Sequence, residues 1–143
     1  MLILAATPLG NPSDASNSLR EAITSAKFIA AEDSRKLSRL CADLGITYTA
    51  KVISFFEGNE QERLGQLIEI LLNGDDLLVV TDAGMPGISD PGYRLAREAI
   101  ARNIHVQVLP GASAVTTALI LSGLPSASFC FDGFPPRTST ARL

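Results

Sequence analysis

Short apolar runs recur along the chain at similar spacing. Five of them stand out, at residues 2–6, 28–31, 52–56, 77–81 and 106–109. Within each run the apolar residues are continuous instead of alternating with polar ones, which is typical of strands buried on both faces of a parallel sheet. The runs predict five parallel strands that start near residues 2, 27, 51, 77 and 105.

Apolar residues at helical spacing fill the stretches between these runs. The clearest stripe ends at Gly45, a residue suited to the left-handed conformation that closes a helix. The stripes are Leu19, Ile23 and Ala26; Leu37, Leu40, Cys41 and Leu44; Leu64, Leu67, Ile68, Leu71 and Leu72; Leu95, Ala96, Ala99 and Ile100; and Val115, Ala118, Leu119 and Ser122. The alternation predicts an α/β fold, a doubly wound five-stranded parallel sheet with helices on both faces.

The pattern changes after Gly123. Residues 128–134 predict one more short strand, and residues 135–143 predict a linker. The 143 residues suffice for one domain with a hydrophobic core, which we expect to occupy residues 1–134. No apolar run is long enough to span a bilayer, and no basic residue precedes the apolar start, so we expect a cytoplasmic protein.

The segments that follow the predicted strands are rich in glycine and proline. The fourth, residues 81–93, holds Gly84, Gly87 and Gly92 together with Pro86 and Pro91. Glycine allows close approach to a ligand, and proline stiffens the rest of the loop. Ligands of open α/β sheets collect beyond the carboxyl ends of the strands, so this loop is a candidate binding loop. The alternative is a loop that only turns the chain.

The fifth segment has the same character on a smaller scale. Pro110 and Gly111 are followed by Ala112, Ser113 and Ala114, directly before a predicted helix. Small residues leave the helix N-terminus open to a carboxylate or phosphate. A helix cap with tight packing against the sheet explains the same residues equally well.

Charge and the rarer residues exclude several classes of function. The formal net charge of −3 argues against a protein that binds nucleic acid over its whole surface, although it allows a local basic patch. His105 is the only histidine, and Cys41 and Cys130 do not form a CxxC motif, so we expect no metal site and no disulfide framework. Dinucleotide, P-loop and hydrolase-elbow motifs are absent from the sequence.

Charged residues gather after the second predicted strand. Arg35, Lys36 and Arg39 form a basic cluster that either contacts a phosphate backbone or is a solvated helix face. Asp33 either serves the chemistry or caps the helix that starts near Ser34. In the fourth loop, Asp82 is a possible ligand for a hydroxyl group, whereas Asp90 sits in a Ser-Asp-Pro-Gly turn and reads as structural. The sequence alone leaves these alternatives open.

In order and spacing, the loop sequences resemble those of a known family. The segments are ATPLGN, AEDSR, TDAGMPGISDPGYRL and LPGASA, followed by GLPSASFCFDGFPPR. Together they resemble the tetrapyrrole methylases, and most of all the branch that methylates the ribose 2′-hydroxyl of a cytidine in 16S ribosomal RNA. The resemblance covers essentially the whole chain. Its most specific part is the long fourth-loop motif joined to AEDSR.

The resemblance implies a cofactor, a topology and partners. The family binds S-adenosylmethionine in a cleft between two α/β domains, and its first domain has the strand order 3-2-4-1-5. Residues 1–134 would be that first domain, and a second domain would be missing. The small ribosomal subunit with its 16S RNA would be the substrate. Apart from the resemblance, a homodimer is expected through the partly apolar face toward the missing domain or through an edge strand. The matching cofactor-binding residues are Pro8, Asp82, Gly84, Pro86, Ile88, Ser89, Ala112 and Ser113.

Site roles are assigned from the position of the charged residues at the cleft end of the sheet. A ribose hydroxyl is a poor nucleophile, so a carboxylate should accept its proton. Asp33 is the first candidate and Glu32 the second, with Arg35 as a phosphate anchor in the catalytic set. Arg35, Lys36 and Arg39 are the predicted RNA-binding residues.

Two departures and two alternatives accompany these hypotheses. The RNA branch commonly has histidines in the loop after strand three, where this chain has Phe56 and Gly58 around Glu57. Corrin relatives carry Gly-Asp-Pro in the fourth loop, where this chain reads Asp82-Ala83-Gly84, which favours the RNA branch. A methylase of a tetrapyrrole or another small substrate is one alternative. A non-catalytic module for ligand binding or dimerisation is the other.

Overall fold

The computed structural model describes residues 1–134 and has five parallel strands in one sheet, ordered β3-β2-β4-β1-β5. The strands are β1 (Leu2–Ala5), β2 (Phe28–Ala31), β3 (Lys51–Ser54), β4 (Leu77–Val80) and β5 (Val106–Leu109). The helices are α1 (Asn17–Ser25), α2 (Ser34–Leu44), α3 (Glu60–Leu72), α4 (Tyr93–Ala101) and α5 (Ala114–Leu121), with short 3₁₀ turns η1 (Pro12–Asp14) and η2 (Glu57–Asn59). The predicted fold class, the strand positions and the strand order are confirmed.

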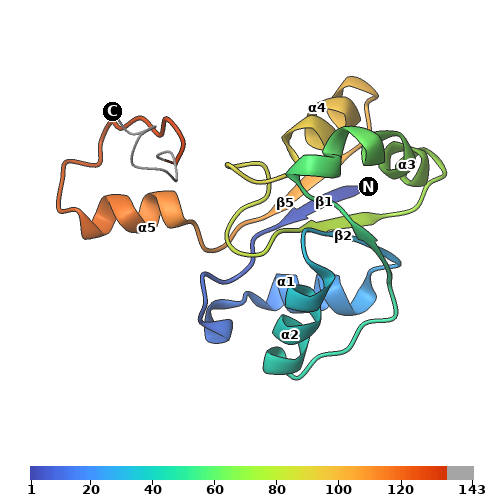
Figure 1. The fold of residues 1–143 in the computed structure, drawn as a ribbon, viewed down its shortest axis with the longest axis horizontal. Coiled ribbons are helices and arrows are strands. Elements are labelled where there is room, and N and C mark those ends of the chain that lie inside the picture. The colour runs from blue at the N-terminus through green and yellow to red at the C-terminus, as the bar shows by residue number, and fades with distance from the viewer. Residues whose placement is uncertain (135–143) are drawn as a thin grey trace.

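Helices cover both faces of the sheet, as the apolar stripes predicted. Figure 1 shows α1 and α2 on one side and α3 and α4 on the other. Each side has its own buried cluster. On one side it includes Ile23 of α1 and Leu37 of α2, and on the other side it includes Leu67 of α3 and Leu95 of α4. This two-sided burial fixes the strand ends, from which the candidate site is built.

Burial of the strands depends on their place in the sheet. All four residues of β4 are buried, and β1 and β2 are nearly as enclosed. The edge strands differ, because β3 has one buried residue and β5 has none. The prediction that every strand is buried on both faces is therefore wrong for the two edge strands, whose sequences KVIS and VQVL include polar residues.

Residues 114–134, which begin with α5, stand away from the body of the fold (Figure 1). The helix forms as predicted, but none of its residues is buried, and the side chains of Ile120 and Leu121 are 71% and 83% exposed. The predicted strand at residues 128–134 is wrong, since no strand forms there. A strand needs a neighbouring backbone to pair with, and this segment lies far from the sheet edges (Figure 1). The predicted linker at 135–143 lies outside the described residues.

The described residues contain neither a membrane-spanning helix nor a cluster of metal ligands. Between residues 1 and 134, no helix is long and apolar enough to cross a membrane. In the same range, no group of three or more histidine, cysteine, aspartate or glutamate side chains is placed to hold a metal ion.

Candidate functional site

The first and fourth loops are joined at the carboxyl end of the sheet. The amide of Thr7 donates to the Gly84 carbonyl at 2.9 Å, and the amide of Gly84 donates to the Thr7 carbonyl at 3.0 Å. Gly84 has φ +84°, which few side-chain-bearing residues adopt. The bridge fixes the start of the fourth loop against the Pro8 turn.

The rest of the fourth loop is held at its far end. The amide of Gly87 donates to the Pro91 carbonyl at 3.0 Å. The carboxylate of Glu60, a buried residue of α3 that is 8% exposed, accepts from the amide of Gly92 at 3.0 Å. Sequence reasoning missed Glu60, because the pairing joins residues far apart in the chain. The loop is thus both permissive and stiff, as its composition predicted, and it presents Ile88 and Ser89 at an exposed tip.

The fifth loop lies against the same place. A Cβ atom added to Gly84 would be 3.5 Å from Leu9 Cδ2 and 3.9 Å from the carbonyl oxygen of Ala112. A Cβ on Gly111 would be only 2.9 Å from the Cβ of Ala6, so this glycine is required for close packing on β1. Ser113 precedes α5 but makes no side-chain cap. The loops after β1, β4 and β5 therefore converge around Gly84.

A cavity of about 340 Å³ lies beside this convergence, at the carboxyl ends of β1, β2 and β4 and against α2. Among the predicted cofactor residues, Pro8 and Asp82 line it. Glu32, Asp33, Lys36 and Arg39 line it as well, together with apolar side chains of α2. The lining does not include Arg35 or the other predicted cofactor residues, so the predicted residues fall into two adjoining groups.

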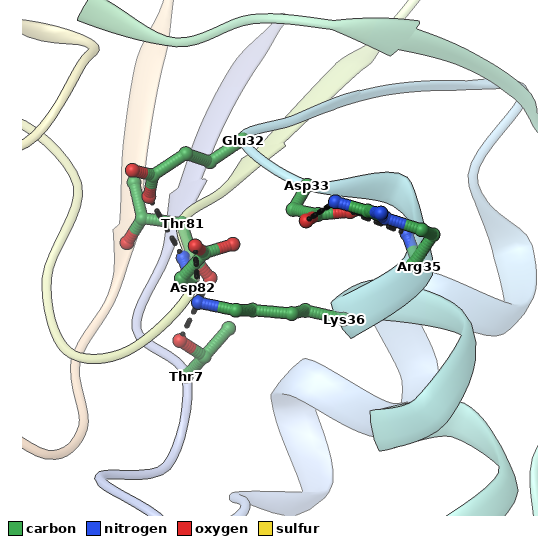
Figure 2. Close-up of polar contacts among 7 residues, drawn as sticks. All are labelled: Thr7, Glu32, Asp33, Arg35, Lys36, Thr81 and Asp82. Atoms are coloured by element: carbon green, nitrogen blue, oxygen red, sulfur yellow. Dashed lines mark hydrogen bonds and ion pairs between the residues drawn. The ribbon is translucent and has the colours of Figure 1, made fainter.

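A polar network at the cavity joins β2, α2 and the fourth loop (Figure 2). Glu32 Oε2 accepts from the amide of Asp82 at 3.0 Å, and Lys36 Nζ donates to Asp82 Oδ2 at 2.7 Å. The hydroxyl of Thr7 donates to the carbonyl of Thr81 at 3.0 Å. The hydrogen bond to Asp82 raises the pKa of Lys36. The network holds Asp82 from two sides.

Asp33 is occupied by its neighbour Arg35. The Arg35 side chain donates to Oδ1 at 3.0 Å and to Oδ2 at 2.8 Å (Figure 2). Asp33 also caps α2, because its Oδ1 accepts from the backbone amide of Arg35 at 2.9 Å. The side-chain hydrogen bonds from Arg35 hold the pKa of Asp33 well below its ordinary range. A carboxylate with so low a pKa is a weak proton acceptor at neutral pH. The predicted cap of α2 by Asp33 is therefore present, and its catalytic role stays a prediction.

Each cation of the predicted RNA-binding cluster lies beside an acidic residue. Arg35 pairs with Asp33, and Lys36 pairs with Asp82 of the fourth loop. Arg39 Nε lies 4.0 Å from Asp43 Oδ2. These pairs are largely exposed, and such pairs contribute only about 0–1 kcal/mol. The patch is therefore locally balanced in charge, but a phosphate group can compete for its cations.

Asp90 belongs to the same charged region, which its turn sequence did not reveal. Burial raises the pKa of Asp90 to about 6, and the negative charges of Glu32 and Asp82 add to the shift. The hydroxyl of Thr81 lies near this carboxyl without meeting hydrogen-bond geometry, and it offsets part of the shift. Glu32 follows β2, whereas Asp82 and Asp90 lie near opposite ends of the fourth loop, so only the folded chain brings the three carboxyl groups together.

Replacing Asp90 by asparagine should stabilise the fold above about pH 6. Because the folded-state pKa is raised from 3.8 to about 6, the folded chain holds more protons than the unfolded chain between these values. Stability is thus lost as the pH rises through this window, and Asp90→Asn escapes the loss. Thermal unfolding should show a gain in the free energy of unfolding of roughly 1 kcal/mol near pH 7.5, a figure that already allows for solvent screening. No gain of this origin is expected near pH 4.

The matched control is Glu69→Gln, on the exposed side of α3. This variant also removes one carboxylate, so a change that it shares with Asp90→Asn is not specific to Asp90. A gain of equal size for Asp90→Asn at both pH values would contradict a raised pKa and would point to relief of packing strain instead.

Comparisons with known proteins agree with the geometry. The sequence profile of the tetrapyrrole (corrin/porphyrin) methylases matches residues 1–139. The ribosomal RNA small subunit methyltransferase I of Mycobacterium tuberculosis (strain H37Rv) is 50% identical over 141 residues, which are 99% of this chain and 50% of that protein. The proteins of the same name from Micromonospora olivasterospora and Thermotoga maritima are 42% and 38% identical, and the match covers 44% and 63% of their lengths.

The chain spans about half the length of the first of these relatives. The profile match nevertheless extends over residues 1–139 of this chain and includes all of its strands and the loops at their carboxyl ends. The chain belongs to the tetrapyrrole (corrin/porphyrin) methylase family.

Proposed function

We propose that this chain is part of an S-adenosylmethionine-dependent methyltransferase that methylates the ribose 2′-hydroxyl of a cytidine in 16S ribosomal RNA. The observation that carries the proposal is the 50% identity, across 99% of the chain, to a protein named ribosomal RNA small subunit methyltransferase I. Such an enzyme would work on small ribosomal subunits in the cytoplasm. The experiments use the long form, which is a protein of the relatives' full length that contains this sequence.

The converging loops fit the cofactor. Gly84, Gly87 and Ser89 have positive φ values, so the fourth loop turns its backbone amides and carbonyls in directions that ordinary residues avoid. A backbone of this kind suits close contact with a ligand. The residues that would hold the cofactor are Pro8, Asp82, Gly84, Pro86, Ile88, Ser89, Ala112 and Ser113. When bound, S-adenosylmethionine supplies a methyl group on a positively charged sulfur, which keeps the carbon–sulfur electron pair as a hydroxyl oxygen takes the methyl.

The chain's own contribution is to position the hydroxyl and accept its proton. Glu32 suits this role better than Asp33, because both oxygens of Asp33 are taken by Arg35. Glu32 lines the cavity and uses Oε2 to accept from the amide of Asp82. The remaining oxygen is then available to the proton. In this proposal Asp33 caps α2 and orients Arg35, which stays the candidate phosphate anchor.

The decisive experiment is methyl transfer from labelled cofactor to small ribosomal subunits by the long form. Label on a cytidine ribose, located by mass spectrometry of nuclease fragments, is the expected result. Label on a base, or on no RNA at all, would overturn the proposal. The family description includes corrin and porphyrin substrates, so a reaction with a tetrapyrrole and none with RNA would establish the alternative.

Removing the basic cluster should weaken RNA binding whatever the RNA sequence. In the long form, Arg35→Ala, Lys36→Ala and Arg39→Ala together remove up to three phosphate contacts. The slope of log affinity against log salt should then fall by about 2, at about 0.7 per contact for single-stranded RNA. Filter binding at several salt concentrations measures both quantities.

The control for the basic cluster replaces Lys27 and Arg102 by alanine. These cations are also paired, with Asp75 and Glu98, but they lie away from the carboxyl end of the sheet. Their removal should change the salt slope little. An equal loss in the control would mean that the RNA responds to total charge and not to the cluster.

A further inference from the structure

Most residues that line the cavity differ from the residues that would hold the cofactor. Of the residues that would hold the cofactor, Pro8 and Asp82 border both compartments, whereas Gly84, Pro86, Ile88, Ser89, Ala112 and Ser113 do not line the cavity. The wall comes instead from the carboxyl ends of β1, β2 and β4, from the turn before α1, and from α2. The sheet end therefore offers a second compartment adjoining the loops that would hold the cofactor.

The wall combines two chemistries. Leu37, Leu40 and Val80 give it an apolar side, whereas Glu32 and Lys36 give it a charged side. Its volume of about 340 Å³ lies at the lower end of the range of about 300–1,000 Å³ that is usual for ligand pockets. An apolar surface suits the face of a base or sugar, carboxylates suit hydroxyl groups, and a lysine suits a phosphate. One nucleotide has all of these groups at this size.

Lys36 gives the compartment a residue that can change partner. Its side chain is 61% exposed, and its ammonium group donates to Asp82 at 2.7 Å. Because exposed ion pairs contribute little stability, a phosphate at the cavity mouth can take the ammonium group from Asp82. The Asp82 carboxylate would then accept from a ligand hydroxyl. Arg39, also at the cavity, adds a second cation within the same helix face.

We propose that this cavity binds the acceptor nucleotide of the RNA, with its base turned out of any helix, its ribose beside Asp82 and Glu32, and its phosphate on Lys36. The inference rests on the proposed function, since it assigns the substrate side of the same site. Single-stranded RNA with splayed bases is the usual target of specific recognition, and enzymes that modify nucleotides isolate them in this way.

The test follows binding of cytidine 3′-monophosphate to the 143-residue chain by amide chemical shifts. Signals of Glu32, Leu37 and Asp82 should move, and 2′-deoxycytidine 3′-monophosphate should bind several-fold more weakly. Lys36→Gln should weaken binding about tenfold, as expected for a lost charge-assisted hydrogen bond. Lys27→Gln, a lysine paired with Asp75 elsewhere, should have no effect.

A second variant guards against loss of the fold. Leu40→Trp fills the cavity without a change of charge, so it should block the nucleotide while the signals of the strands keep their positions. Three results would overturn the proposal: shifts that fall outside the cavity, equal shifts with inorganic phosphate alone, or displacement of the nucleotide by S-adenosylhomocysteine from the same signals. The last would assign the cavity to the cofactor.

The two proposals can fail separately. The nucleotide experiment involves no methyl transfer. A long form that methylates small subunits, next to a chain that ignores the nucleotide, would keep the proposed function and remove the cavity assignment. Nucleotide binding by the chain, without RNA methylation by the long form, would remove the proposed function.

Discussion

A Gly84→Val variant of the long form is expected to lose measurable binding of S-adenosylmethionine. Gly84 has φ +84°, and its missing side chain faces Leu9 and the carbonyl of Ala112. A valine at this position places two methyl groups where the first, fourth and fifth loops meet. Steric exclusion of a ligand from that space should cost about 3 kcal/mol or more, which is about a hundredfold in affinity. Isothermal titration calorimetry measures the loss.

Gly74→Val is the matched control for backbone strain. Gly74 has φ +87°, nearly the value of Gly84, but a Cβ there meets nothing within 4 Å, and the residue precedes β4 at the opposite end of the sheet. Both variants should therefore lose similar stability from strain, of about 1–3 kcal/mol. Only Gly84→Val should lose the cofactor. Unchanged affinity in a folded Gly84→Val protein would remove these loops from the cofactor site.

Features that depend on local sequence could be predicted well. The run at residues 77–81 predicted the central strand β4, because a strand buried on both faces needs continuous apolar residues. Gly45 predicted the end of α2, and it closes that helix at φ +65°. The composition of the fourth loop predicted a stiff backbone with unusual conformations, which the positive φ values of its glycines confirm.

Features that depend on how side chains meet in the folded chain could not be predicted. Asp33 and Arg35 are close in the sequence, but the sequence does not show that the Arg35 side chain occupies both carboxylate oxygens and so makes Asp33 a weak proton acceptor. Asp90 lies in a turn sequence, and its pKa is raised by burial in the folded chain and by the charges of Glu32, from the loop after β2, and Asp82, from the start of its own loop. The pattern of α5 predicted a helix, but a one-dimensional pattern does not say whether anything packs against that helix.

The 143-residue chain by itself is expected to fold but to transfer no methyl group. Folding is expected because both faces of the sheet are covered by helices and carry buried clusters. Transfer is not expected, because the loops that would hold the cofactor end at an exposed tip, where Ile88 is 50% exposed. Water at such a site weakens each electrostatic contact and keeps the nucleophile hydrated. The relative from Mycobacterium tuberculosis that is named as a methyltransferase is about twice as long as the match.

The measurement compares the chain and the long form, each with small ribosomal subunits and labelled cofactor. Label should enter the RNA only with the long form. The chain should also self-associate in size-exclusion chromatography, since the apolar side chains of Leu121 and Phe134 are 83% and 66% exposed among the described residues. Ile120→Lys together with Leu121→Lys should reduce that association without unfolding the domain, because α5 has no buried residue. If the chain alone incorporated label at a rate comparable to the long form, these loops and the cavity would constitute the whole active site, and shielding from water by further residues would be unnecessary.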